Sequence, residues 1–205
     1  MAQPFHDRDG WIWMDGEFIP HRDARVHVLT HAMHYASSVF EGERAYDGVI
    51  FKSKEHSERL HNSARILGFK VPYSAEEIDR AKAELIAKQS MPNCYVRAVA
   101  WRGSEQMGVS AKRDDVHVAI AAWEWGDYFA DKMKGIRLMI APWRRPAPDT
   151  APANSKAAGL YMICTLSRHA ATDAGFDDAM MFDWRGQIAE GTGANIFFVR
   201  DGVLH

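Results

Sequence analysis

The chain has 205 residues, 47% of them hydrophobic, and its 25 basic and 27 acidic side chains give a formal net charge of −2. Nucleic-acid binders usually carry a basic excess, so this balance argues against that class. No apolar run is long enough to cross a bilayer, and the polar N-terminus lacks the apolar core of a signal peptide. Two cysteines, Cys94 and Cys164, cannot build a disulfide framework or a four-thiolate metal site, so we expect a reducing, cytoplasmic environment.

The first part of the chain predicts strands joined by tight turns. Asp15-Gly16 and Asp47-Gly48 each separate two apolar runs. Both residues of such a pair tolerate the positive φ that short hairpin turns require. The expected strands cover residues 11–14, 17–19, 26–30, 39–46 and 49–52.

Two helices and two further strands are expected next. The first helix begins near residue 54, carries Leu60, Ala64 and Leu67 on one face and ends before the C-cap candidate Gly68. The second starts at a capping box that opens with Ser74 and runs to about residue 89. Strands follow at 94–101 and 116–123. Strands, two helices and again strands indicate an α+β domain.

The second half of the chain is less regular. Residues 126–134 have the composition of a linker, and the proline-rich stretch 142–152 predicts either an ordered loop or a second domain boundary. Strands are expected at 136–141, 178–183 and 195–200, a helix at 157–174, and a small-residue turn at 188–195. Asp201-Gly202 predicts a hairpin whose return strand stops at His205, so we expect the native chain to continue.

Two local patterns have ordinary explanations. His31 and His34, with His27 upstream, have a spacing that can bring two imidazoles together on a helix, but the pattern places no third ligand. We therefore expect packed or exposed histidines and no metal site. Gly191-Thr192-Gly193 is a weak phosphate-binding signal that a tight turn explains equally well.

Lys156 and Glu190 are the candidates for chemistry, and each has two interpretations. Lys156 stands at the entrance of the predicted helix, where the helix dipole does not favour a cation, and small residues follow it. Taken alone, it is either a surface lysine or a catalytic amine. Glu190 stands in the predicted turn, where its carboxylate is either solvated or part of a site.

Several motifs occur together and in a fixed order. They are His34-Tyr35, Val39-Phe-Glu-Gly42, Arg44-x-Tyr46-Asp47-Gly48, His56-x-x-Arg59, Tyr95-x-Arg97, Met107-Gly108-Val109, Lys156-Ala-Ala-Gly-Leu-Tyr161, Gly175-Phe-Asp177 and Ala189-Glu190-Gly191-x-Gly193-x-Asn195. This order resembles that of the class IV aminotransferases, the fold-type-IV pyridoxal-phosphate enzymes. The resemblance extends over nearly the whole chain, and the two motifs ending in Arg97 and Val109 make it most similar to branched-chain amino-acid aminotransferases.

The resemblance implies an α+β fold of type IV. A small N-terminal α/β domain would cover residues 1–128, an interdomain loop 129–134, and the start of a larger β-rich domain 135–205. The family's chain continues further and there supplies more phosphate contacts and the loop that holds the substrate's α-carboxylate.

The resemblance also assigns roles toward pyridoxal 5′-phosphate. Lys156 would bond the cofactor's aldehyde and move a proton, which requires an amine that can be neutral. Glu190 would lie beside the pyridine nitrogen. Tyr161, five residues after Lys156 and expected on a neighbouring face of the same helix, would hydrogen-bond the ring oxygen. Arg59 would hold the phosphate as a bidentate partner. Asn195, in the same motif as Glu190, would complete this set.

For the substrate, the resemblance implies a pocket with aromatic walls. Tyr35, Phe40 and Tyr95 would contact apolar side chains, and Arg97 would receive the side-chain carboxylate of glutamate. Val109 would enter the partner subunit's site, which implies at least a homodimer.

The function implied is transamination of leucine, isoleucine and valine with 2-oxoglutarate, giving branched 2-oxo acids and glutamate. Its partners would be these small molecules and further copies of the chain, with no nucleic acid or membrane. Two alternatives stay open. One is a sibling activity: D-amino-acid transaminase, R-selective amine transaminase or aminodeoxychorismate lyase. The other is a non-catalytic fragment that serves only in oligomerisation. Ala194 departs from the acid that branched-chain enzymes often carry there.

Overall fold

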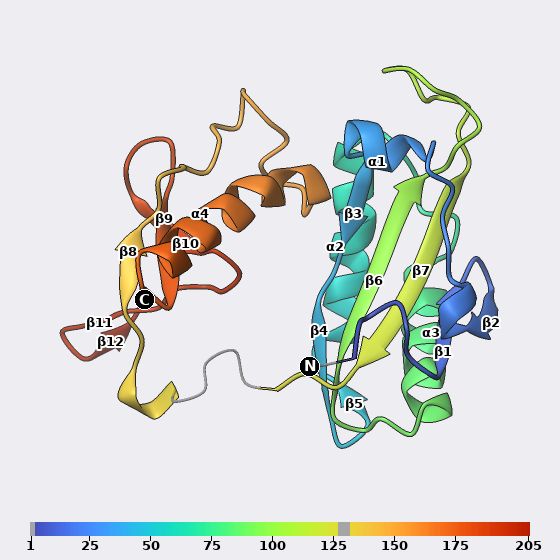
Figure 1. Ribbon diagram of the computed structural model, residues 1–205, viewed down its shortest axis with the longest axis horizontal. Coiled ribbons are helices and arrows are strands. Elements are labelled where there is room, and N and C mark those ends of the chain that lie inside the picture. The colour runs from blue at the N-terminus through green and yellow to red at the C-terminus, as the bar shows by residue number, and fades with distance from the viewer. Residues whose placement is uncertain (1–2, 127–131) are drawn as a thin grey trace. The chain divides into compact units, whose positions relative to one another are not determined.

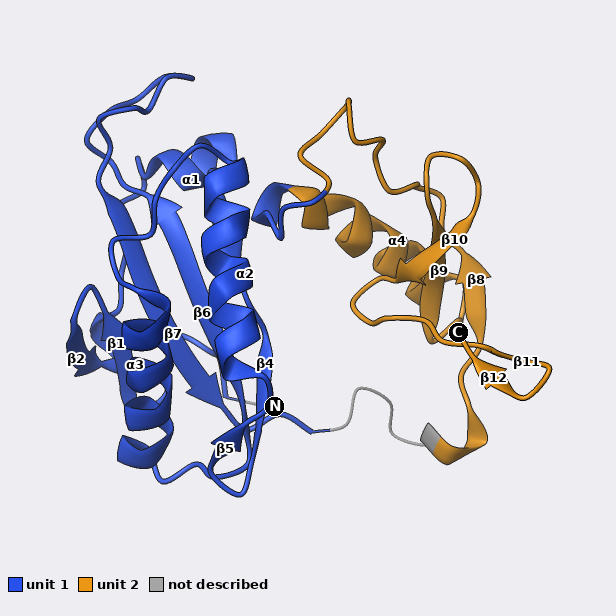
Figure 2. Ribbon diagram, turned by 180° about the vertical axis from the view of Figure 1, so that it is seen from behind, with its two compact units in different colours: residues 1–126, 154–159 blue, residues 127–153, 160–205 orange. Residues whose placement is uncertain are grey.

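The computed structural model describes residues 3–126 and 132–205. Its contacts divide the chain into two compact units, one containing residues 1–126 and 154–159 and the other residues 127–153 and 160–205 (Figure 2). The sequence places residues 154–159 in the second domain, whereas in the structure they pack with the first unit. Part of the predicted interdomain loop, 129–131, lies outside the described residues, and Lys132–Lys134 form a short 3-10 turn.

An antiparallel sheet is the framework of the first unit (Figure 1). Its strands are β1 (Trp11–Met14), β2 (Glu17–Pro20), β3 (Ser38–Phe40), β4 (Glu43–Tyr46), β5 (Val49–Ile50), β6 (Cys94–Arg102) and β7 (Val116–Trp123). They follow the order β2-β1-β7-β6-β4-β5, and β3 also pairs with β6. Because β3 pairs with residues 99–101 of β6 and β4 with residues 94–96, the two continue one another along β6. The strand predicted for 39–46 is thus divided at Glu41-Gly42.

The predicted hairpins are confirmed, but the strand expected at 26–30 is wrong. Asp15, Gly16, Asp47 and Gly48 all have positive φ, as the turn residues of tight hairpins do. Residues 26–30 instead form a turn, in which the Leu29 backbone N–H donates to the His27 ring and Thr30 bonds back to the same residue. These local hydrogen bonds replace strand pairing.

Helices α2 (Ser53–Ile66) and α3 (Ala75–Lys88) cover one face of this sheet (Figures 1 and 2). Leu60 and Ala64 are fully buried, as their helical spacing predicts. The capping box is confirmed by reciprocal hydrogen bonds between Ser74 and Glu77 at the start of α3. Between the helices and the sheet lies a core that includes Trp13, Val39, Val71, Ile78, Leu85, Val96, Ala98, Ala100, Val118 and Ile120.

Within the described residues of the first unit, the opposite face of the sheet carries no helix as long as α2 or α3. Side chains of a strand alternate between faces, so the neighbours of buried Val96, Ala98 and Ala100 on β6 point away from α2 and α3. Arg97 and Trp101 are two of these, and they line a mainly apolar groove of about 370 Å³. The short helix α1 (His31–Tyr35) and the 3-10 turn His21–Asp23 connect the strands around it.

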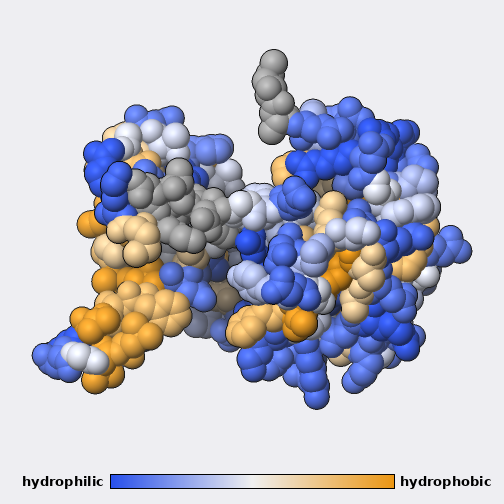
Figure 3. Space-filling view, turned by 90° about the horizontal axis from the view of Figure 1, so that it is seen from below, coloured by the Kyte–Doolittle hydropathy of each residue, from blue (hydrophilic) through white to orange (hydrophobic). Residues whose placement is uncertain are grey.

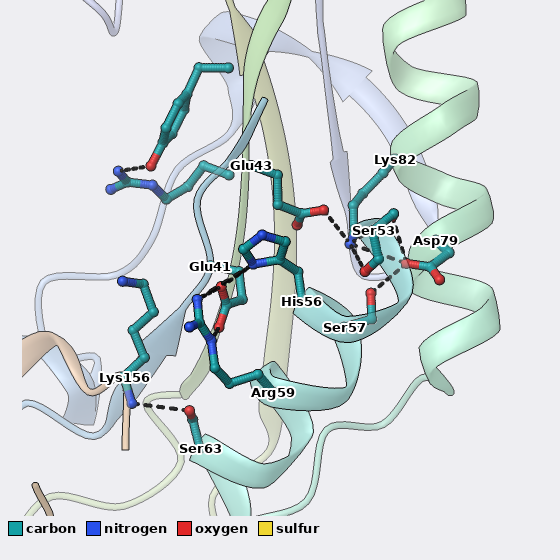
Figure 4. A network of polar contacts seen from close by, with 12 residues as sticks. Glu41, Glu43, Ser53, His56, Ser57, Arg59, Ser63, Asp79, Lys82 and Lys156 are labelled. Carbon is teal, nitrogen blue, oxygen red and sulfur yellow. Dashed lines mark hydrogen bonds and ion pairs between the residues drawn. The ribbon is translucent and has the colours of Figure 1, made fainter. Parts of the chain in front are cut away.

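Lys82 of α3 is fully buried and lies at the centre of a polar network (Figure 4). Its ammonium lies 2.9 Å from Glu43 Oε2, 3.1 Å from Asp79 Oδ1 and 3.2 Å from Ser53 Oγ. These acceptors match the three N–H donors of an ammonium, so the charge can be buried. The loss of hydration on burial affects the Glu43 carboxyl more than the nearby charge of Lys82 does, and it raises the pKa of Glu43 above its usual range. The network joins α3 to the start of α2 and to β4.

The described residues of the second unit form a small mixed sheet and one α-helix. Strand β8 (Leu138–Ile140) runs parallel to β9 (Asp178–Phe182), and β10 (Ile188–Gly191) pairs antiparallel with β9. A 3-10 turn at Ala158–Tyr161 leads into α4 (Met162–Asp173), which Gly175 follows with a positive φ.

Three predictions for this unit need correction. The helix expected from residue 157 begins as a 3-10 turn at Ala158–Tyr161 and is an α-helix only from Met162. The small-residue stretch at 188–191 is strand β10 rather than a turn, because β9 supplies a hydrogen-bonding edge. The strand expected at 195–200 is reduced to β11 (Val199–Arg200), which forms a hairpin with β12 (Val203–Leu204) through Asp201-Gly202.

The β11–β12 hairpin exposes an apolar surface. Phe197, Val199 and Leu204 are between 66% and 70% exposed. Figure 3 shows hydrophobic colour over this projection at the left end of the molecule. Within residues 3–126 and 132–205, no helix is long and apolar enough to cross a membrane.

Lys82→Met is expected to lower the free energy of unfolding by about 3–5 kcal/mol, because it leaves the Glu43 carboxylate buried without its cation. Equilibrium urea unfolding measures the change. The control is Lys54→Met, at a side chain that is 74% exposed, where a change within about 0.5 kcal/mol is expected. Adding Glu43→Gln to Lys82→Met should restore part of the loss. Equal stability of the wild type and the Lys82→Met variant would show that the Lys82–Glu43 pair does not stabilise the fold.

Candidate active site

Lys156 is held at the edge of strand β3. Ala157 forms an antiparallel bridge with Val39, and the Phe40 N–H donates to the Lys156 carbonyl at 3.2 Å. The Lys156 N–H donates to Ser63 Oγ of α2 at 3.0 Å (Figure 4). Lys156 therefore precedes the 3-10 turn in non-helical backbone. The prediction that Lys156 and Tyr161 share one helix is wrong, because bonding to β3 and α2 keeps the backbone at Lys156 out of the helix.

Small residues after Lys156 allow this docking. A Cβ atom at Gly159 would lie 2.8 Å from the Ala36 Cβ, closer than such atoms normally approach. Ala157 is buried beneath the bridge to β3. The small residues after Lys156 therefore let this segment pack closely within the first unit.

Phe40 connects Lys156 to Arg97. The Lys156 ammonium nitrogen lies 5.0 Å from the centre of the Phe40 ring, and the Arg97 guanidinium carbon lies 4.7 Å from it. Cations at this distance are attracted to the ring's π-electrons. The structure thus brings three of the predicted site residues into one cluster.

Aromatic rings surround Arg97. Its Nη2 donates to Tyr95 Oη at 2.8 Å, and its guanidinium carbon lies 5.2 Å from the Tyr95 ring and 5.8 Å from the Trp123 ring. Its Nε is buried and has no hydrogen-bond partner among the described residues. A guanidinium with a buried unsatisfied N–H and apolar walls is suited to an incoming carboxylate. Trp123 was not singled out from the sequence, because nothing in its pattern distinguishes it from a core residue.

Gly42 allows Tyr95 to reach this position. A Cβ atom at residue 42 would lie 1.8 Å from Tyr95 Oη and 2.8 Å from its Cζ. The Tyr95 ring also packs against Trp123, at 4.9 Å between centroids, and Trp125, at 5.8 Å. The division between β3 and β4 therefore makes room for the tyrosine that holds Arg97.

Arg59 projects from α2 and is clamped by a buried acid (Figure 4). Its Nε and Nη2 donate to the two carboxylate oxygens of Glu41, each at 2.6 Å, and His56 Nδ1 lies 2.7 Å from Oε2. Burial alone would raise the pKa of Glu41, but hydrogen bonds from Arg59 and His56 outweigh it and hold the pKa below its usual range. The roles of Glu41 and His56 were missed, although the i, i+3 spacing of His56 and Arg59 on one helix was a visible signal.

Tyr35 and Val109 lie around His31. The buried His31 ring has Nδ1 2.6 Å from Ser37 Oγ and Nε2 2.9 Å from the Gly108 carbonyl, and its centroid lies 4.6 Å from that of Tyr35. Tyr35 is 43% exposed and Val109 86% exposed. His31 is therefore a packed histidine. No three His, Cys, Asp or Glu side chains of the described residues gather so as to hold a metal ion.

The remaining predicted residues belong to the second unit. Glu190 lies on β10, and its Oε1 is 2.9 Å from Arg145 Nε. Tyr161 is half-buried at the end of the 3-10 turn, and Asn195 is exposed after β10. Arg145 also donates to the carbonyl of Leu160 at 3.3 Å. It was missed because it lies in the proline-rich loop, where no periodicity indicates its direction.

Comparisons with known proteins agree on one family. The family model for amino-transferase class IV matches residues 38–205. A probable branched-chain-amino-acid aminotransferase of Rickettsia bellii is 46% identical over 196 residues, which cover 95% of this chain and 67% of the relative.

Solved structures give the same result. The crystal structure of the branched-chain amino acid aminotransferase of Escherichia coli has a TM-score of 0.92 and 40% identity, and the match covers 96% of this chain and 67% of that one. An aminotransferase from Brucella abortus, solved bound to the cofactor PLP, has a TM-score of 0.81 at 27% identity, over 96% and 70% of the two chains. The chain thus spans about two thirds of the length of the proteins it matches.

Gly42→Ala is expected to displace Tyr95 and to cost about 1–3 kcal/mol of stability, because the new methyl group overlaps the phenol. Urea unfolding measures the stability, and tryptophan emission reports the change around Trp123 and Trp125. The control is Gly126→Ala, where an added Cβ meets no atom within 4 Å. If Gly42→Ala matched the control in both measurements, the close approach of Tyr95 would be refuted.

Proposed function

This chain belongs to the class IV aminotransferase family, and from that premise we propose that the protein transfers amino groups from leucine, isoleucine and valine to 2-oxoglutarate with pyridoxal phosphate as cofactor. The observation that carries the proposal is the cluster of Lys156, Phe40 and Arg97 in the first unit. It joins an amine, an apolar ring and a guanidinium with an unsatisfied N–H. The reaction needs these three chemical groups around one substrate.

The donor set of the chain fits this cofactor. The side chains of Lys156 and Arg59 lie on the same side of α2 in Figure 4, and Arg59 is 52% exposed although its Nε edge is fixed. An amine suits the aldehyde, and a guanidinium suits the phosphate dianion. In the second unit, Glu190 offers a carboxylate that suits a protonated pyridine nitrogen. Tyr161 and Asn195 would complete the cofactor contacts. When bound, the cofactor supplies an electrophilic carbon and an electron-withdrawing ring.

Lys156 is the residue that moves protons in this proposal. Its Nζ would take a proton from the substrate's α-carbon, which requires the neutral amine. Arginine could not do this, because its guanidinium stays protonated. Hydrogen bonds from the Lys156 backbone to β3 and α2 hold the start of the side chain in place.

Arg97 and the rings around it would accept two kinds of side chain. The rings of Phe40 and Tyr95 offer apolar walls to a branched alkyl group. Arg97 would bind the side-chain carboxylate of glutamate or 2-oxoglutarate. Tyr35 and Val109 would contribute further apolar contacts.

We further infer a cytoplasmic homodimer or higher homo-oligomer. Val26, Val28, Met33 and Val109 of the first unit are each more than half exposed, and a monomer gains nothing from exposing such a group of apolar side chains. Cys94 and Cys164 are both buried free thiols, which suits a reducing compartment.

Borohydride reduction of the full-length protein with pyridoxal phosphate, followed by peptide mass mapping, tests the cofactor and the catalytic lysine together. The pyridoxyl group is expected on Lys156, because its amine lies in the cluster while Lys82 is sealed in the core. Lys156→Ala should abolish the label. Labelling of a different lysine, or of none, would overturn the proposal.

Arg97→Ala is expected to weaken the half-reaction with glutamate by about 2–5 kcal/mol, because the substrate's second carboxylate loses its partner in a buried site. The half-reaction with leucine should change little, since an alkyl group makes no ion pair there. Single-turnover rates with glutamate and with leucine measure the two half-reactions, and leucine serves as the internal control. Equal losses for the two substrates, together with lower thermal stability, would mean that Arg97 is structural.

A further inference from the structure

Glu41 is a buried carboxylate whose partners all come from one helix. It is only 1% exposed, and its own N–H donates to the Ala98 carbonyl at 2.8 Å, which fixes its backbone against β6. Both of its carboxylate oxygens accept hydrogen bonds from Arg59, and Oε2 also lies 2.7 Å from His56 Nδ1. Because the carboxylate is ionised, Nδ1 of His56 must carry the proton that is shared in this contact.

The neighbouring acid on the other side of Gly42 shows what a purely structural pair looks like in this fold. Glu43 pairs with Lys82, and both side chains are 0% exposed. Arg59 by contrast is 52% exposed, so its pair with Glu41 begins in the core and ends at the surface (Figure 4). In Figure 4, the Arg59 side chain and the Lys156 side chain both lie to the left of α2.

A half-exposed arginine needs such a clamp if it is to bind an anion tightly. Its long side chain loses rotamer entropy when it is fixed. A bidentate carboxylate fixes the plane of the guanidinium before the ligand arrives, so the ligand does not bear that cost. The helix itself does not depend on this pair, because buried Leu60, Ser63 and Ala64 already hold α2 against the sheet.

We propose that Glu41, assisted by His56, is a positioning residue that orients Arg59 toward the cofactor's phosphate group. This inference rests on the proposed function, in which Arg59 is the phosphate ligand. Glu41 acts through Arg59 and does not itself touch the cofactor. Its removal should therefore weaken ligands that carry the phosphate and leave unchanged those that lack it.

The test compares two aldehydes on the apo form of the full-length protein. Dissociation constants for pyridoxal phosphate and for pyridoxal, which has no phosphate, are measured by absorbance titration. Glu41→Gln is expected to raise the constant for pyridoxal phosphate roughly tenfold or more, because an amide cannot accept the bidentate pair, and to leave that for pyridoxal unchanged. In an Arg59→Ala background, the same substitution should cause no further loss.

Two further variants keep the test decisive. Glu58→Gln changes an exposed carboxylate on the same helix and should alter neither constant. His56→Asn removes one partner of Glu41 without leaving the arginine unpaired, and it should weaken pyridoxal phosphate by a smaller factor, again without affecting pyridoxal. This variant answers the question even if Glu41→Gln does not fold.

The outcomes distinguish a failure of the role proposed for Glu41 from a failure of the proposed function. If the folded variants bind pyridoxal phosphate as the wild type does, or lose both aldehydes equally, Glu41 is structural and the inference is overturned. If the wild-type protein binds neither aldehyde, the proposed function fails and the inference fails with it.

Discussion

The pairing of Ala157 with Val39 at the free edge of β3 is the contact on which the site of the first unit depends. It brings a segment from late in the sequence against a strand formed early, and the hydrogen bonds of Lys156 to Phe40 and Ser63 fix its position. The lysine consequently stands on non-helical backbone beside a strand end. At loops and strand ends a side chain can point in more directions than within a helix, and the sheet beneath keeps the backbone of Lys156 rigid.

At the break between β3 and β4, three consecutive residues make three different contacts: Glu41, Gly42 and Glu43. Glu41 reaches Arg59 at the surface of α2, whereas Glu43 is sealed against Lys82 of α3. Gly42 lies between them and leaves the space that Tyr95 Oη occupies. One interruption thus fixes an arginine, anchors a helix and positions a tyrosine, and it divides the strand predicted for residues 39–46 into β3 and β4.

The features that could be predicted from sequence are those with local causes. The Asp-Gly hairpins, the Ser74 capping box and the apolar face of α2 depend on residues within one turn of each other, and all of them form. The break at Gly42 depends on Tyr95, which is distant in sequence, whereas strand β10 depends on its pairing with the preceding strand β9. For the site, motif order pointed to Lys156, Arg59 and Arg97, but not to their partners. Glu41 lies inside a recognised motif, yet only the packed structure shows which cation it meets.

Arg59 and Arg97 are restrained to different degrees, and the proposed function gives a reason for the difference. Arg59 is held by a buried carboxylate through two charge-assisted hydrogen bonds, which suits a ligand that stays bound through many turnovers. Arg97 is held by the neutral phenol of Tyr95 and keeps a buried Nε without a partner among the described residues, a state that costs about 1–3 kcal/mol. A carboxylate clamp on Arg97 would remove that cost, but it would also occupy the donors that a substrate must reach. An arginine left partly unsatisfied among aromatic rings can bind a carboxylate in one half-reaction and leave room for an alkyl group in the other. In the proposed function, a guanidinium that no carboxylate clamps is what would let one pocket serve two substrates.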